Sequence, residues 1–410
     1  MANAAIIETT TEVGTMCANA KTLRQAIDLA RKVVPTRAML PVLSGILLDG
    51  TYGRIVATDM EITIEIKLEL GADVAIVAPA KLLSDVLKSH TGAVSLHVDG
   101  TTLAVRGDGR ETVIQGWPAS DMPTCAPAAG SLHTFGVPVD TWQGLAAAVS
   151  SSVGKDQTRP ILCGILCDFD GGAVRMTATD SYRLSTAAAV YYPHATDTGL
   201  HAIIPAKALA ILGQASKGAK VWQGMEYIPA THVHVGADDK YVSLEIGPVC
   251  VSVRPVDGQY PNYKQLIPET FEHTFTLDRA ALLDAVRSVG AMAKKNAPIR
   301  LLFADDGHGC KVSATTQDVG ESSASVPFAG TATYTPVTRT LGYYPNDPRN
   351  TEDPTELDHM EIGFNPAFLA DGLATFAGQT IDLQVIDPLR PLTIVEGEHT
   401  FLLMPVRLSS

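Results

Sequence analysis

The sequence predicts an α+β fold of three similar domains, and three observations support this prediction. Residues 36–65 and 158–187 share a Thr-Arg opening, a Pro-x-Leu-x-Gly-Ile-Leu run and an Ala-Thr-Asp sequence. The chain has 410 residues, whereas one domain usually has roughly 150. Each third of the chain has a helical pattern, then strands, a second helical pattern and more strands. Because the repeat is one domain long, we interpret it as domain duplication and not as a short-repeat solenoid.

The first predicted domain covers residues 1–130. Its first helix is indicated by Leu23, Ile27, Ala30 and Val34, which recur at helical spacing and form one apolar stripe. Strands follow, including an alternating run near residues 54–70 and a hairpin that turns at Asp99 and Gly100. A short second helix is expected at residues 79–90, and a segment rich in Pro, Ala and Ser marks the boundary near residues 118–131.

The other two predicted domains repeat this order. Residues 131–268 form the second, with helical patterns at 140–154 and 205–218. Residues 269–410 form the third, with helical patterns at 277–295 and 365–378. A polar, Pro-rich insertion at about 331–358 has no periodicity, so we expect an exposed excursion there. Close hairpin turns favour antiparallel pairing throughout.

Composition indicates an ordinary globular protein. The N-terminal residues carry acid where a signal peptide carries base, and no apolar run approaches the roughly 18 residues of a membrane span. The six cysteines are scattered without a Cys-x-x-Cys pair, which favours reduced thiols. We therefore expect a cytoplasmic protein without membrane contact. The net charge of −13 argues against nucleic acid only if the charge is evenly spread.

Two pairs of residues have a spacing that can serve chemistry. Asp59 and Glu61 lie two apart on a predicted strand and can act as an acid/base pair. The repeat has Asp180 and Tyr182 at these positions, so we favour a turn-stabilising or interdomain role for the aspartates. His232 and His234 alternate on a strand, but no nearby cluster supplies a third metal ligand. We therefore expect no catalytic residue, no metal and no cofactor.

Basic residues recur beside the apolar stripe of the predicted helices. A solvated charged face is the ordinary explanation of such stripes, but their repetition favours contact with a partner. Aromatic residues do not interleave with them, so sequence-independent contact with duplex phosphates is favoured over stacking on single strands. The basic residues concerned are Arg24, Arg31, Lys81, Lys88, Lys207, Arg279, Arg287 and Lys294.

The chain resembles the bacterial DNA polymerase III β subunit family, the sliding clamps. The matching segments span all three predicted domains in order: TRAMLPVLSGILL, VATDMEI, PAKLLSDVLK, ATDSYRL, DGQYPNYKQLIP, FNPAFLADGL and LLMPVRL. The resemblance implies a DNA clamp fold with two inward helices and outer antiparallel sheets per domain. It also implies two chains joined head to tail into a homodimeric ring around double-stranded DNA.

The resemblance further implies a function and two sets of site residues. The chain is expected to be a non-catalytic processivity factor that tethers the catalytic subunit of the replicative DNA polymerase, the clamp loader and other proteins with a clamp-binding motif. DNA contacts fall on Arg37 and Lys81, with Lys155 and Arg159 as nearer candidates in the second domain, and we add Arg24 and Lys207 from the helix faces.

A partner-peptide groove is expected between the second and third domains. A mainly apolar pocket with a methionine and a few polar rim groups suits a peptide anchored by Leu or Phe. Ser181 and Tyr182 depart from the Gly-His of the family, so the peptide preference is expected to be shifted. The groove residues implied by the resemblance are Leu162, Thr179, Ser181, Tyr182, Arg183, Leu184, Pro261, Leu266, Leu402, Met404, Pro405, Val406 and Arg407.

Two other functions stay open at the level of sequence. One is an enzyme that uses Asp59 and Glu61, which loss of a hydrolytic activity on substitution of Asp59 would favour. The other is a monomeric DNA-binding module without a ring, which a solution mass near one chain would favour.

Overall fold

The computed structural model describes residues 14–123, 135–191, 199–217, 220–223, 226–293, 297–304, 309–316, 320–329, 337–338, 356–357 and 359–408. The chain forms two compact units. The first unit comprises residues 1–143 and 191–256, and the second comprises 144–190 and 257–410. The predicted domain boundaries at 130 and 268 are not tested by this division and stay a prediction. The predicted α+β class with antiparallel sheets is confirmed in both units.

The first unit begins with a four-stranded sheet in the order β1-β6-β7-β8, which helices α1 and α2 accompany. The Asn19 side chain caps α1 by accepting from the amides of Lys21 and Thr22. The predicted hairpin turn is confirmed, because Gly100 has φ +59° between β6 and β7. The bounds are β1 Thr15–Asn19, α1 Ala20–Ala30, α2 Ala80–Leu87, β6 Ala93–Asp99, β7 Thr102–Gly107 and β8 Arg110–Gln115.

The apolar stripe of α1 is confirmed with one correction. Leu23, Ile27 and Ala30 are fully buried, as the helical spacing predicts. Val34 is only half-buried, and Val33 is buried in its place. The helix ends at Ala30, so the 3.6-residue period no longer decides which side chain of the following turn faces the core.

A nine-stranded sheet completes the first unit, in the order β10-β17-β18-β19-β4-β3-β2-β5-β9. Its strands come from both segments of the unit, because β19 pairs with β4. The bounds are η1 Pro41–Ser44, β2 Gly45–Asp49, β3 Arg54–Thr58, β4 Ile62–Lys67, β5 Ala75–Pro79, β9 Trp117–Pro118, η2 Ala119–Asp121, β10 Phe135–Pro138, β14 His201–Pro205, α4 Ala206–Ala215, β15 Lys220–Gln223, β16 Glu226–Pro229, β17 His232–Ala237, β18 Val242–Ile246 and β19 Val249–Val253. Helix α3, Val139–Ser150, contains the point at which the chain passes to the second unit.

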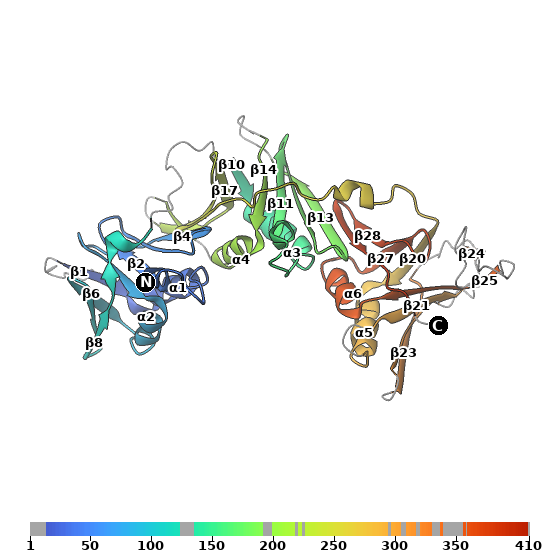
Figure 1. Ribbon diagram of the computed structural model, residues 1–410, viewed down its shortest axis with the longest axis horizontal. Helices are drawn as coiled ribbons and strands as arrows, with labels where there is room; N and C mark the ends of the chain where they lie inside the picture. The colour runs from blue at the N-terminus through green and yellow to red at the C-terminus, as the bar shows by residue number, and fades with distance from the viewer. Residues whose placement is uncertain are drawn as a thin grey trace. The chain divides into compact units, whose positions relative to one another are not determined.

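The second unit contains the strand order β11-β12-β13-β29-β28-β27-β20 and a four-stranded sheet in the order β23-β22-β21-β26. Helices α5 and α6 lie side by side (Figure 1). The bounds are η3 Pro160–Cys163, β11 Gly164–Asp170, β12 Ala173–Thr179, β13 Arg183–Val190, η4 Tyr263–Leu266, β20 His273–Asp278, α5 Arg279–Gly290, β21 Ile299–Ala304, β22 Cys310–Thr316, β23 Gly320–Val326, β24 Val337–Thr338, β25 Glu356–Leu357, β26 His359–Phe364, α6 Pro366–Leu373, β27 Thr380–Val385, β28 Leu392–Glu396 and β29 His399–Leu403.

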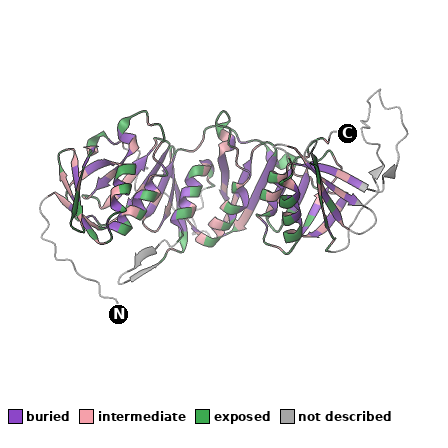
Figure 2. Cartoon of the chain, turned by 90° about the horizontal axis from the view of Figure 1, so that it is seen from below, coloured by how far each residue is buried: buried purple, intermediate pink, exposed green. Residues whose placement is uncertain are grey.

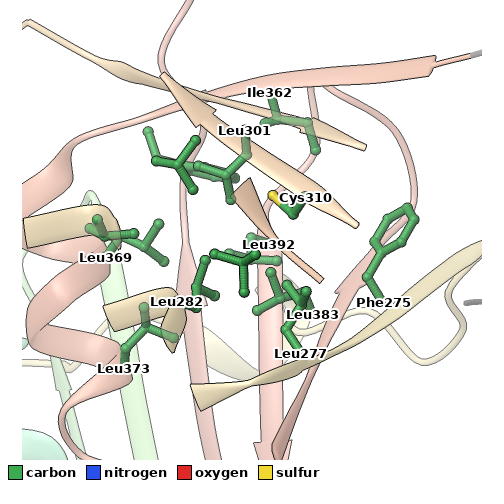
Figure 3. Packing of buried hydrophobic residues seen from close by; sticks show 14 of the residues in the cluster. Phe275, Leu277, Leu282, Leu301, Cys310, Ile362, Leu369, Leu373, Leu383 and Leu392 are labelled. Atoms are coloured by element: carbon green, nitrogen blue, oxygen red, sulfur yellow. The ribbon is translucent and has the colours of Figure 1, made fainter. Parts of the chain in front are cut away.

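The core of the second unit lies between these two sheets and the two helices (Figure 3). Leu282 from α5 and Leu369 from α6 are fully buried in it. Phe275 and Phe303 stack with their ring centroids 4.0 Å apart, an arrangement that adds to the hydrophobic gain of burial. Along each unit, buried residues concentrate on the strands, while the helices also carry exposed residues (Figure 2).

Several sequence expectations fall outside the described residues. Lys294 and Cys125 are among them, as is most of the predicted insertion at 331–358. Within that insertion, only the backbones of β24 and β25 are described, and they pair antiparallel. The other five cysteines are free thiols, as expected. None of the helices among the described residues is long and apolar enough to cross a membrane.

Candidate peptide-binding groove and exposed cations

The second unit joins its two chain segments through a pair of strands. Strand β13 pairs with β29, with Arg183 opposite Leu403 and Leu184 opposite Leu402. Beyond the ladder, the Met404 amide donates to the Tyr182 carbonyl at 2.9 Å, and the Val406 amide donates to the Gly363 carbonyl at 2.8 Å. These backbone bonds bring together predicted groove residues that are more than 200 positions apart in the sequence. We call this place the second junction, after the unit that contains it.

A tight turn precedes β13 and fixes the direction of its first side chains. The Asp180 carboxylate accepts from the amides of Tyr182 and Arg183, each at 3.0 Å. The Thr179 hydroxyl donates to the Arg183 carbonyl at 2.7 Å. Ser181 has φ +78°, a left-handed conformation that costs free energy for any residue with a Cβ. These side-chain hydrogen bonds therefore hold Ser181 in a backbone conformation that glycine usually adopts.

Tyr260 supports this turn from behind. The Thr179 amide donates to the Tyr260 hydroxyl at 3.1 Å, and that hydroxyl donates to the Thr177 carbonyl at 3.4 Å. Burial raises the pKa of the Tyr260 hydroxyl well above its ordinary value, because the phenolate loses its hydration there. The hydroxyl is therefore neutral and able to donate and accept at once.

Arg183 is the central charged group of the junction. Its side chain is 4% exposed, and it forms ion pairs with Asp180 at 3.0 Å and with Asp371 at 2.8 Å. Its guanidinium carbon lies 4.2 Å from the centroid of the Phe368 ring, within range of a cation–π contact. A buried guanidinium requires such compensation, because its desolvation alone costs on the order of several kcal/mol. Arg183 thus fixes the position of α6, which carries Phe368 and Asp371, against β13.

A cleft of about 230 Å³ opens beside this network. Apolar groups and charged groups share its wall. The Tyr182 and Phe368 rings lie 6.3 Å apart between centroids, and Tyr182 is 62% exposed. The residues that line the cleft are Val153, Gly154, Lys155, Asp156, Arg159, Leu162, Asp180, Tyr182, Arg183 and Phe368.

The charged groups of the cleft are mostly compensated. Hydrogen bonds from the Thr158 hydroxyl and amide lower the pKa of Asp156, so this carboxylate is ionised at neutral pH. Arg159 contacts Asp156 at 3.4 Å and donates to the Ser181 hydroxyl at 3.1 Å. Lys155 has no ion-pair partner among the described residues. The cleft therefore offers an apolar pocket with one uncompensated cation at its side.

The predicted groove residues differ in their surroundings in the structure. Leu162, Tyr182 and Arg183 line the cleft, and Met404 and Val406 are exposed just after β29. Leu184 and Leu402 are only 1% and 2% exposed, so they support the wall from inside. Pro261 and Leu266 are exposed on the segment around η4. Contact of any of these residues with a peptide stays a prediction.

Sequence reasoning missed Phe368 and Asp371 in this site. Phe368 is the third residue of α6, and the helices that begin at Ala80 and Ala206 have Leu82 and Ala208 at the third position. The aromatic residue at this position of α6 was the available signal. No comparable signal identified Asp371, because its partner Arg183 lies 188 positions away.

The predicted DNA-contacting cations differ in their surroundings. Arg37, Lys81, Lys155 and Arg159 are exposed. Arg24 is half-buried, and its Nε is buried without a hydrogen-bond partner among the described residues. Lys207 is exposed as well, and its ammonium lies 2.8 Å from Asp59. A DNA-binding role stays a prediction for all six.

Asp59 has the turn-stabilising role that the repeat predicts. One carboxylate oxygen accepts from the amides of Glu61 and Ile62 at 3.2 and 2.8 Å. The other oxygen forms the ion pair with Lys207. His232 contacts the neighbouring Thr231 hydroxyl at 3.0 Å. Among the described residues, no three His, Cys, Asp or Glu side chains are grouped to hold a metal ion.

Comparison with known proteins agrees with this architecture. Residues 136–262 match the family model of the DNA polymerase III beta subunit, central domain, and residues 15–126 match that of its N-terminal domain. A beta sliding clamp of Streptomyces coelicolor is 25% identical over 406 residues, covering 94% of this chain and 97% of that protein. A beta sliding clamp of Synechococcus elongatus is 26% identical, covering 95% of this chain and 98% of that protein.

Solved structures show the same fold. The DNA polymerase sliding clamp of Bacillus subtilis aligns with a TM-score of 0.80 at 19% identity, covering 97% of this chain and 100% of that one. A DnaN sliding clamp of Pseudomonas aeruginosa bound to griselimycin aligns with a TM-score of 0.79 at 21% identity, covering 96% and 99%. The class defined by fold and sequence is thus that of clamp proteins of DNA replication. The chain belongs to the DNA polymerase III beta subunit family, the bacterial beta sliding clamps, which are processivity factors.

Replacing Arg183 with Ala is expected to destabilise the second unit by about 3 kcal/mol or more, because it leaves Asp180 without its buried partner. Hydrogen exchange of the β13 and β29 amides measures this local opening free energy. Arg106→Ala, which breaks the exposed pair with Glu111, is the control and should cost less than about 1 kcal/mol. Equal protection in the Arg183 variant and the unaltered chain would contradict the assigned role.

Proposed function

We propose that this chain is a non-catalytic sliding clamp that closes around duplex DNA as a homodimeric ring and holds its partners through the cleft at the second junction. The observation that carries the proposal is the cleft itself, where Tyr182, Phe368 and Leu162 surround a volume of about 230 Å³. A cavity of this size with an apolar wall and a few placed polar groups suits one or two anchoring side chains of a short peptide.

Ligand-bound relatives support the use of such a site. The clamps of Pseudomonas aeruginosa and Bartonella birtlesii have each been solved bound to griselimycin. We infer that the partners of this chain are the catalytic subunit of a replicative polymerase, a clamp loader and other proteins that handle DNA. Each would insert a segment with a Leu or Phe anchor. Ser181 and Tyr182 place an aromatic ring at the rim, which favours anchors with a flat or branched apolar surface.

The exposed cations support contact with DNA that does not depend on base sequence. Arg37 and Lys81 are exposed without an ion-pair partner among the described residues. They lie in a chain with a net charge of −13, so acid elsewhere repels DNA from other surfaces. Contacts to phosphates alone carry no sequence information and are weakened by salt. Such contacts permit movement along the duplex if the ring prevents escape.

Two strand edges support closure between copies. Strand β8 ends the four-stranded sheet of the first unit, and β23 ends that of the second. Edge strands present unpaired backbone donors and acceptors that can pair with another chain. We infer that β8 of one copy pairs with β23 of the next. This contact joins two different surfaces, and such contacts form a ring when the rotation closes. Val113, 63% exposed on β8, would be covered there.

Replacing Val113 with Asp is expected to weaken the dimer at least tenfold, because an ionised carboxylate would be desolvated beside the paired edges. Light scattering at micromolar concentration should give about twice the 43.4 kDa chain mass for the unaltered protein. The variant should approach the mass of one chain. Val395→Asp, at an exposed position of β28, is the matched control. A dimer that tolerates the Val113 change would refute this edge as the interface.

Replacing Tyr182 with Ala is expected to weaken binding of a short peptide carrying adjacent Leu and Phe by about tenfold or more, as the loss of an aromatic hot spot does. Isothermal titration calorimetry on the full chain measures the affinity. Tyr52→Ala removes an exposed tyrosine in the first unit and should have no effect. An unchanged affinity in the Tyr182 variant would show that the cleft is not the peptide site.

A further inference from the structure

The first unit contains a copy of the junction that forms the cleft. Strand β4 pairs there with β19, with Ile62 opposite Val253. The Arg254 amide donates to the Glu61 carbonyl at 3.0 Å, and the Val256 amide donates to the Ile203 carbonyl at 2.9 Å. These bonds correspond to those that Met404 and Val406 form in the second unit. We call this place the first junction.

The turn before the strand is also repeated. Thr58 bonds to the Ile62 carbonyl at 3.1 Å, and the Met60 amide donates to the Thr58 hydroxyl at 3.0 Å. Met60 has φ +80°, and Ser181 has φ +78° at the equivalent position. Asp59 therefore corresponds to Asp180, and Ile62 corresponds to Arg183. The two junctions share a backbone and differ in their side chains.

The decisive difference lies in the helix that follows each acceptor strand. Because the acceptors Gly363 and Ile203 correspond, Phe368, which lines the cleft, corresponds to Ala208. The preceding residue is Ala367 in α6 and Lys207 in α4. The Lys207 ammonium donates to Asp59 at 2.8 Å and to the Val33 carbonyl at 3.3 Å. The lysine side chain thus connects α4, the turn and the segment after α1.

The lysine side chain crosses the place in the first junction that corresponds to the cleft of the second junction. Val33 follows the last residue of α1 by three positions, as Val153 follows the last residue of α3. Val153, Asp180 and Phe368 all line the open cleft in the second unit. In the first junction Lys207 bonds to both Val33 and Asp59, the counterparts of Val153 and Asp180. In the second junction Asp180 is paired with Arg183, and the cleft beside this pair stays open.

We propose that the Lys207–Asp59 ion pair fills the first junction and so determines that each chain takes a peptide at the second junction alone. The inference rests on the proposed peptide-binding function. It also assigns Lys207 a role other than phosphate contact, because the charge of its ammonium is balanced by Asp59. Removal of the pair would expose a pocket bounded by Val33 and by the turn that carries Met60, which is already 45% exposed.

The test is the number of peptides bound per chain, measured by isothermal titration calorimetry on the full-length protein. The probe is a short synthetic peptide with adjacent Leu and Phe. The unaltered chain is expected to bind one peptide. Lys207→Ala is expected to bind two, the second more weakly. Adding Tyr182→Ala to this variant should leave the new site and weaken the original one.

A second variant guards against misfolding. Asp59→Asn keeps a side-chain oxygen for the amides of Glu61 and Ile62 while it removes the charge that holds Lys207, and it should also create a second site. Lys217→Ala, which removes an exposed cation just after α4, is the matched control and should bind one peptide.

The outcomes separate the two proposals. One peptide bound by the unaltered chain and by both folded variants would overturn the inference and leave the proposed function intact. No peptide bound by the unaltered chain would overturn the proposed function and the inference that rests on it. Two peptides bound by the unaltered chain would also overturn the inference, because the ion pair would not close the first junction.

Discussion

Backbone pairing between distant segments is the constraint on which both units depend. Strand β13 can extend its sheet only because β29 supplies the missing donors and acceptors, and β4 depends on β19 in the same way. Buried peptide groups that lack hydrogen-bond partners are costly, so each junction is closed by a ladder and by two further backbone hydrogen bonds beyond it. The pairing fixes the turn at Asp180. The fixed turn then directs Tyr182 and Arg183 toward α6.

The same backbone supports two different surfaces, which separates the fold from the site. In the second junction a buried arginine binds two carboxylates and packs on an aromatic ring, and a cleft remains beside it. In the first junction a lysine occupies the corresponding space. Duplication therefore supplied a scaffold, while a few side-chain positions determine whether that scaffold presents a pocket. This division explains how one architecture can present a cleft at one junction and a closed surface at the other.

Much of the fold was predictable from local patterns. The buried positions Leu23 and Ile27 followed from helical periodicity, and the turn at Gly100 followed from its Asp-Gly sequence. The role of Asp59 followed from comparison of the two repeats. The burial of Val33 instead of Val34 was not predictable, because the periodicity of a helix gives no information beyond its last turn. Local patterns thus identify elements more reliably than the ends of elements.

The site was predictable only in part, because its contacts are long-range. Leu162, Tyr182 and Arg183 were identified through the family resemblance, and all three line the cleft. Asp371 reaches Arg183 only through tertiary packing, so no pattern near either residue indicated the pair. Leu184 and Leu402 matched the family sequence, but the sequence did not reveal that β13 and β29 bury both side chains in the sheet. Burial depends on strand partners that lie far away in the chain.

Topological capture of DNA is the central claim, and retention on circular DNA tests it most directly. The protein, loaded on a nicked circular plasmid, would be passed through a gel-filtration column in salt high enough to screen phosphate contacts. The account predicts that the protein elutes with the circular plasmid and is released when one restriction cut makes the plasmid linear. Release from the intact circle at the same rate, or retention on linear DNA with free ends, would contradict it.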